Sequence, residues 1–232
     1  KKLTSAYLKE KYLLQVRGNH IILSIKNNDL SNLTSVFSLM MEKIQIMSKG
    51  DRMEIFKEVG SPKKFVSQFD IKNFSGTHGV GHTRMATESA VSTMGAHPFS
   101  TGEDQCLVHN GSISNHNSVR RTLEGEGQKF ETDNDSEVAA SYLTWRMANG
   151  FSLESALTKS LDDLDGFFTF LVGTKNGFAV IRDRIACKPA VLAETDQYVA
   201  FGSEYRALTN LPHIDSANVW EPEPATVYFW KH

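Results

Sequence analysis

The sequence is poor in cysteine, since Cys106 and Cys187 are the only two among 232 residues. So few cysteines argue against a disulfide scaffold and favour a reducing compartment, which predicts a cytoplasmic protein. No set of histidines and cysteines has the spacing of a zinc site, and no set of cysteines matches an iron–sulfur cluster. The sequence therefore predicts no metal.

Long apolar runs and basic stretches are also missing. No apolar run approaches the roughly 20 residues that cross a bilayer, and the charged start of the chain lacks the apolar core of a secretion signal. The net charge is −2 and no basic stripe stands out. No glycine-rich loop has phosphate-binding spacing. We therefore expect no membrane, nucleic acid or cofactor as a partner.

The length and composition fit one folded domain. A chain of 232 residues with 40% hydrophobic residues can bury a sizeable core. There are no internal repeats and no low-complexity linker. We predict a single domain over residues 1–232.

The pattern of apolar and polar residues predicts both strands and helices in the first part of the chain. Expected there are a strand over 19–26, a helix over about 33–44, a strand over 76–84, an irregular loop over 86–100, and a strand over 106–108 that ends at Asn110-Gly111. Asn134, with Glu137 three residues on, predicts a capping box for a helix that runs to about Asn149 and stops at Gly150. Ser152 is expected to cap a helix over 153–164.

After this second helix the period of the pattern changes to that of strands. The dipeptide Asn176-Gly177 indicates a hairpin. Expected here are strands over 167–173, 178–183, 190–194, 198–202 and 226–230, and a short helix over 204–211. Because strands and helices come in blocks, the sequence predicts an α+β fold with a largely antiparallel sheet.

Arg84 and Asp135 are complementary to the two charged ends of a free amino acid. The planar fork of arginine suits an α-carboxylate, and an aspartate suits an α-ammonium group. Taken singly, each has a simpler interpretation: Arg84 as a surface ion pair and Asp135 as a helix cap stabilised by the helix dipole. Their combination with the residues between them favours a binding site.

His109-Asn110-Gly111 is the second candidate site. Hydrolysis of an amide passes through a tetrahedral oxyanion, to which an asparagine NH2 and a glycine N–H can donate side by side. Glycine also lets the backbone approach a substrate closely. The alternative is a hairpin turn, since Asn-Gly is a frequent turn signal. His97 precedes Pro98 and is therefore held in an extended loop. Cys106 and Cys187 are both expected to be buried.

The order of the motifs carries more information than any one of them. GHTRMAT (81–87), AHPF (96–99), HNGSISN (109–115), ETDNDSE (131–137), DGFFTF (165–170) and RDRIACKPAV (182–191) follow one another as in class II glutamine amidotransferases. The chain resembles this class of N-terminal-nucleophile hydrolases from Gly76 to Arg206. The stretches GHTRMATESAV, HPFSTGED and WEPEPATVY are similar to the stand-alone amidotransferase subunits of glutamate-synthase-like and N-methylglutamate-synthase-like complexes.

The resemblance implies a fold and a set of site residues. The fold is a four-layer αββα sandwich with largely antiparallel sheets. Arg84 would bind the carboxylate of glutamine and Asp135 its amine, Thr87 and His97 would line the pocket, and Asn110 and Gly111 would form the oxyanion hole.

The chain departs from the family pattern at its nucleophile. The family uses an N-terminal cysteine whose own α-amine acts as the base, followed by an RGxDSxG element. This sequence begins Lys1-Lys2-Leu3, and Arg17-Gly18-Asn19 lacks the DSxG part. A cysteine inside a chain has no free α-amine. We expect the nucleophile strand to exist as a further segment or a separate chain, and the present chain alone to be inactive.

The resemblance implies a function for the complete protein. It would hydrolyse glutamine to glutamate and pass ammonia to a synthase-type partner subunit, a flavoprotein, within a hetero-oligomer. The alternative is a non-catalytic glutamine-binding or assembly subunit of an N-methylglutamate-synthase-like complex.

Overall fold

The structure is a computed structural model that describes residues 12–25, 44–83 and 91–232. The chain divides into two compact units, one within residues 1–47 and 54–75 and the other formed by 48–53 and 76–232. The single domain over residues 1–232 stays a prediction. The predicted helix at 33–44 lies outside the described residues except for its last position. In the described part of the chain, no helix is long and apolar enough to span a bilayer.

The first unit is a hairpin and a short helix around an aromatic cluster. Strands β1 (Leu13–Arg17) and β2 (His20–Ser24) are antiparallel, and helix α3 (Pro62–Gln68) precedes a 3-10 turn at Ile71–Asn73. The ring of Phe69 lies 5.0 Å from His20 and 5.2 Å from Phe56. Strand β2 confirms most of the predicted strand at 19–26, whereas β1 and α3 were missed.

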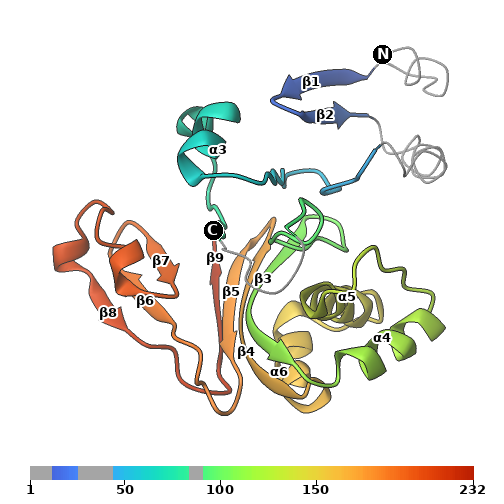
Figure 1. Cartoon of the computed structure of the whole chain (residues 1–232). Helices are drawn as coiled ribbons and strands as arrows, with labels where there is room; N and C mark the ends of the chain where they lie inside the picture. The colour runs from blue at the N-terminus through green and yellow to red at the C-terminus, as the bar shows by residue number, and fades with distance from the viewer. Residues whose placement is uncertain (1–11, 26–43, 84–90) are drawn as a thin grey trace. The chain divides into compact units, whose positions relative to one another are not determined.

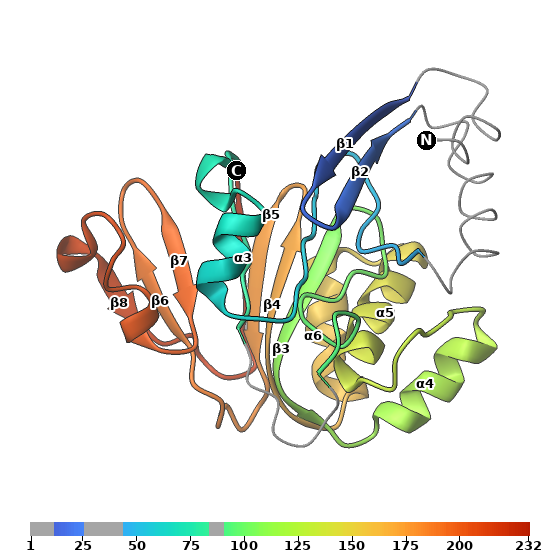
Figure 2. The ribbon, with the colours of Figure 1, turned by 45° about the horizontal axis from the view of Figure 1, so that its top comes forward.

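The second unit is built on a four-stranded antiparallel sheet with helices on one face (Figures 1 and 2). The sheet has the order β3 (Gln105–Ile113), β4 (Gly166–Thr174), β5 (Gly177–Arg182) and β9 (Val227–Lys231). The helices are α4 (His116–Gly125), α5 (Asp135–Ala148) and α6 (Leu153–Asp163). Fully buried side chains such as Leu107, Phe168 and Phe170 from the sheet and Leu143 and Leu157 from the helices form one core. Burying each of these side chains contributes roughly 1.5–3 kcal/mol.

A smaller antiparallel sheet of the order β7-β6-β8 follows β5 in the chain. Its strands are β6 (Val191–Glu194), β7 (Val199–Gly202) and β8 (Asn218–Trp220), and the last of these was not predicted. Trp230 Nε1 of β9 donates a hydrogen bond of 3.0 Å to Glu194 of β6. The predicted α+β class with antiparallel sheets is confirmed, as are the hairpin at Asn176-Gly177 and the strands at 167–173, 178–183, 190–194, 198–202 and 226–230.

Two predicted elements are wrong. Residues 76–83 form no strand, because three glycines in eight residues, Gly76, Gly79 and Gly81, disfavour a ladder. The helix expected at 204–211 is only a 3-10 turn at Tyr205–Ala207. Its hydrogen bonds join residues three apart, as from Leu208 N to Tyr205 O, and Thr209, Asn210 and Pro212 oppose a longer helix.

Helix α5 begins as predicted, but its cap differs in one bond. The Asn134 side chain accepts a hydrogen bond of 2.8 Å from Ser136 N, and Gly150 follows the helix end with a φ of 89°. Glu137 does not reach back to Asn134 as a capping box requires. Its buried carboxylate accepts from Glu131 N and Thr132 N, at 2.8 Å each, because these N–H groups of the incoming loop lie closer. These two hydrogen bonds fix the loop that leads into Asp135.

The first residues of β3 are anchored by a buried carboxylate. Asp104 accepts hydrogen bonds from three consecutive backbone N–H groups, those of Asp51, Arg52 and Met53, at 2.8–3.0 Å. Burial raises the pKa of the Asp104 carboxyl, but these three hydrogen bonds and the charge of Lys175 outweigh it, and the pKa is lowered. The anchor holds the start of β3, the strand that carries the candidate oxyanion hole.

Candidate functional site

Asn110 and Gly111 lie inside a strand and not at its end. In the ladder between β3 and β4, Asn110 is opposite Thr169 and Gly111 is opposite Phe168, and pairing continues to Ile113. The predicted end of the strand at Asn110-Gly111 is therefore wrong, and so is the alternative in which this dipeptide forms a hairpin turn. Asn110 is exposed, on the sheet face opposite to that of the buried neighbours His109 and Ile113.

Gly111 is required by the backbone of the neighbouring strand. It has a φ of +147°, and a Cβ atom there would lie 2.0 Å from Phe167 O. From the sequence, the small size of Gly111 is expected to allow the approach of a substrate. In the described residues the close neighbour is β4, so the glycine is needed for the fold whether or not a substrate binds.

The N–H of Gly111 points away from β4, toward the outer edge of β3. The N–H of Phe168 donates to the Asp183 carboxylate, and the C=O of Phe168 accepts from Asp183 N, at 2.9 Å each. Both groups therefore face away from β3. Phe168 and Gly111 are therefore a non-hydrogen-bonded pair, and the N–H of Gly111 is directed to the other side of its own strand. No other described residue takes a hydrogen bond from it. It is thus placed as a free donor at the strand edge.

Asp135 lies at the same edge. It is the first residue of α5, and its Oδ2 accepts a hydrogen bond of 3.0 Å from Ile113 N. Gly111 and Ile113 are two residues apart, so their N–H groups point in the same direction about 7 Å from each other along the strand. A backbone donor and an ionised carboxylate thus share one edge.

Asp135 remains ionised far into the acidic range. Burial raises the pKa of its carboxyl, but the His109 ring, whose Nδ1 lies 3.7 Å from Oδ1, the Ile113 N–H and the charge of His116 outweigh burial and lower the pKa to about 2. The position at the N-terminus of α5 acts in the same direction. At neutral pH the site therefore offers a negative charge to a ligand.

We expect Asp135→Asn to reduce the free energy of unfolding in a pH-dependent way. A carboxyl whose pKa falls from 3.8 to about 2 on folding stabilises the native state above pH 4, and this contribution is lost as the pH falls through about 2. Allowing for partial exposure, the contribution is about 1–2 kcal/mol. Urea unfolding between pH 2 and pH 7 measures it. A difference in unfolding free energy between wild type and variant that stayed constant over this pH range would contradict the lowered pKa of Asp135.

Nε2 of the His97 ring lies 2.9 Å from Ser136 Oγ. The two ring nitrogens of His97 therefore do not both face the site. The same hydroxyl is 2.9 Å from Nδ1 of the buried His109 and 3.3 Å from Asp135 Oδ1. The ring of His82 lies 4.5 Å from that of His97. His97 was predicted from the sequence as a site residue, whereas the hydrogen-bonding roles of Ser136 and His109 were not. Strand alternation places His109 on the buried face, whereas nothing in the sequence marks Ser136 beyond its position next to Asp135.

Two predicted ligands, Arg84 and Thr87, lie outside the described residues, so their placement stays a prediction. Cys106 is buried in β3, as expected, but Cys187 is exposed, contrary to expectation. Its loop is held open by Asp183, which accepts from Ile185 N at 2.7 Å, and by Arg182, which donates to Lys188 O at 2.9 Å. Within 12–25, 44–83 and 91–232, no group of three acidic, histidine or cysteine side chains could hold a metal ion.

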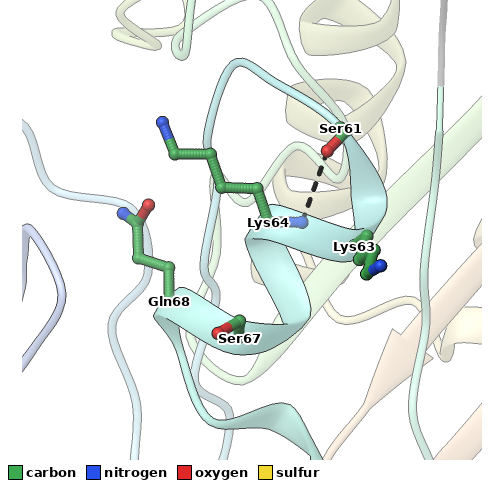
Figure 3. Close-up of a pocket in the computed structure, with 5 residues that line it drawn as sticks. All are labelled: Ser61, Lys63, Lys64, Ser67 and Gln68. Carbon is green, nitrogen blue, oxygen red and sulfur yellow. Dashed lines mark hydrogen bonds between the residues drawn. The ribbon is translucent and has the colours of Figure 1, made fainter.

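Two hollows are lined by other residues. One, of about 430 Å³, is lined by Ser61, Lys63, Lys64, Ser67 and Gln68 of α3 and its cap (Figure 3). Figure 3 shows the side chains of Lys63 and Lys64 on different sides of this short helix. The other, of about 570 Å³, lies at the far end of β3 from Asp135 and includes Gln105, Lys175 and Lys231. Neither is lined by Asn110 or Asp135.

Known proteins share this sequence and fold. Residues 82–210 match the family model described as a glutamine amidotransferase domain. The chain is 64% identical over 217 residues to the glutamine amidotransferase-like protein GlxB of Rhizobium meliloti (strain 1021), covering 94% of this chain and 72% of that protein. It is 35% identical over 216 residues to a putative glutamine amidotransferase of Methanothermobacter thermautotrophicus, covering 90% and 70% respectively.

The solved structure of glutamine phosphoribosylpyrophosphate amidotransferase from B. subtilis has a similar fold, with a TM-score of 0.52 and 24% identity. The match covers 63% of this chain and 32% of that chain, so the present chain corresponds to about a third of it. The chain thus has an α+β sandwich fold similar to that of this amidotransferase, and the predicted fold class is confirmed. The chain belongs to the glutamine amidotransferase family.

Proposed function

We propose that this chain is the glutamine-binding part of an amidotransferase that hydrolyses glutamine and passes ammonia to a separate synthase subunit. The observation that carries the proposal is the common edge of β3, where the Gly111 N–H points outward and the Asp135 carboxylate is bound to the N–H of Ile113, two residues along the strand. A free glutamine has an ammonium group at one end and a reacting amide at the other. The spacing along the strand suits a ligand of that length.

The chemistry assigns a role to each residue. Asp135 binds the α-ammonium group, Arg84 of the 81–87 motif binds the α-carboxylate, and Thr87 lines the pocket. The Gly111 N–H and the exposed Asn110 carboxamide donate to the oxyanion that forms when a thiolate attacks the side-chain amide. Ammonia then leaves, and water releases glutamate from the thioester. His97 supports the site through Ser136 and need not contact glutamine.

The thiolate is not supplied by either cysteine of this sequence. Cys106 is buried in the strand that carries Asn110, and Cys187 is exposed in the loop after β5. Neither has a free α-amine to act as the base. We propose that an N-terminal cysteine on a further segment or chain completes the site and that these residues are inactive without it.

The proposed partner is a synthase of the glutamate-synthase-like or N-methylglutamate-synthase-like type, with a flavoprotein subunit that receives the ammonia. The 64% identity to a glutamine amidotransferase-like protein, of which this chain spans 72%, supports the amidotransferase part of this proposal.

The proposal is tested with glutamine labelled with ¹⁵N in the amide, supplied to the full-length protein together with its native partner subunits. We expect glutamate to form and the label to enter the amine product even with excess unlabelled ammonia present, since ammonia is passed directly. Glutamine binding without glutamate production would favour the alternative of a non-catalytic glutamine-binding or assembly subunit. If the protein neither bound nor hydrolysed glutamine, both the proposed function and this alternative would be refuted.

A further inference from the structure

The hydroxyl of Ser136 is the meeting point of three groups from three parts of the second unit. His97 Nε2 comes from the loop before Pro98, His109 Nδ1 from β3 and Asp135 Oδ1 from the start of α5. Ser136 is only 2% exposed, and the His109 side chain 1%. A buried polar cluster of this kind is stable only when its donors and acceptors match.

Counting protons fixes the orientation of each group. A serine hydroxyl has one hydrogen to donate and can accept two hydrogen bonds. The ionised Asp135 can only accept, so the hydroxyl donates to Oδ1 and both histidines must donate to Oγ. His109 then carries its proton on Nδ1 and His97 on Nε2. A neutral His109 of this form has no N–H at Nε2, which agrees with the absence of a hydrogen-bond partner for that buried atom among the described residues.

The count also shows what is left for a ligand. A carboxylate offers about four acceptor positions. Ile113 N–H occupies one on Oδ2 and the Ser136 hydroxyl one on Oδ1. The Asp135 side chain is 22% exposed, so the remaining positions can accept from an ammonium group. With both oxygens held, the carboxylate plane cannot rotate away.

We propose that Ser136 is a positioning residue that fixes the Asp135 carboxylate for the α-ammonium group of glutamine, with its own proton directed to Asp135 by the N–H groups of His97 and His109. This inference deepens the proposed function and rests on it. It makes Ser136 a determinant of amine recognition rather than of amide hydrolysis.

The test compares two substrates in the full-length protein with its partner subunits. L-glutamine carries the α-amine, and glutaramate is the same molecule without it. We expect Ser136→Ala to lower kcat/KM for glutamine about tenfold, mainly through KM, and to leave kcat/KM for glutaramate within about twofold. The preference for glutamine over glutaramate thus falls about tenfold. An unchanged preference would overturn the proposal.

Two further variants separate positioning from folding. Ser141→Ala is the matched control, because Ser141 is equally buried in α5 but donates to Gln128, 3.5 Å away, and not to the site. It should leave the preference unchanged. Ser136→Thr keeps the hydroxyl and should retain the preference within about twofold, whereas a tenfold loss would count against the inference.

A measurement on the unaltered protein removes any dependence on folding of a variant. The ¹⁵N chemical shifts of His109 should report a proton on Nδ1 and a bare Nε2 at neutral pH, and the opposite tautomer would overturn the proton assignment. Asp135→Asn distinguishes this inference from the proposed function. If it does not change the preference for glutamine, the site assignment itself fails, whereas an effect of Asp135→Asn without an effect of Ser136→Ala refutes only the role of Ser136.

Discussion

Replacing Asn110 by alanine is expected to lower kcat for glutamine hydrolysis roughly 100- to 1000-fold in the full-length protein with its partners. Removal of one oxyanion-hole donor typically costs this much, because the donor acts on charge that exists only in the transition state. The KM for glutamine should change little, since the ligands proposed to hold the substrate are Arg84 and Asp135. Steady-state glutamate production measures both constants.

The structure offers controls for this variant. The Asn110 side chain is exposed and has no hydrogen-bond partner among the described residues, so its removal should not reduce the melting temperature. Asn110→Asp keeps the shape but places a negative charge beside the oxyanion, and should be at least as damaging. Asn176→Ala alters the other Asn-Gly dipeptide and should leave kcat unchanged. Wild-type kcat in Asn110→Ala would remove Asn110 from the mechanism.

Gly111→Ala is expected to destabilise the second unit by roughly 3–5 kcal/mol or to prevent folding. The φ of +147° disfavours any residue with a Cβ, and that atom would lie 2.0 Å from Phe167 O, so β3 and β4 must separate at this pair. A protein of this size loses about 2–4 °C in melting temperature per kcal/mol, which predicts a fall of about 10 °C. Thermal unfolding followed by circular dichroism measures it.

The control for Gly111 is Gly125→Ala. Gly125 is the last residue of α4, and a Cβ there meets nothing within 4 Å. This substitution should be neutral or stabilise the helix by up to about 1 kcal/mol. If Gly111→Ala melted at the wild-type temperature, the strand geometry at the candidate oxyanion hole would be wrong.

Local sequence was sufficient for elements that local chemistry controls. Ser152 caps α6, Gly150 follows the end of α5, and Asn176-Gly177 joins β4 to β5, because caps and tight turns depend on residues within a few positions of each other. Local reasoning failed at 76–83 and 204–211, where apolar residues suggested regular elements that glycine and proline oppose.

The candidate site shows the limit of local reasoning most clearly. Asn110-Gly111 and Asn176-Gly177 are the same dipeptide, and both glycines have a φ near +140° to +150°, yet one lies inside a strand and the other joins two strands. The difference comes from residues more than fifty positions away: Phe168 pairs with Gly111, and the carbonyl oxygen of Phe167 lies against it. Only the tertiary structure brings these strands together.

The sequence by itself determined the family, the α+β class and the candidate residues Arg84, Thr87, His97, Asn110, Gly111 and Asp135, because motif order and residue chemistry are properties of the chain. The tertiary structure decided that Asn110 and Gly111 lie within a ladder and that Asp135 reaches the same strand edge. It also placed His97 Nε2 within hydrogen-bonding distance of Ser136 Oγ. These facts depend on hydrogen bonds between residues distant in the sequence, and such bonds form only when β3 and α5 pack together.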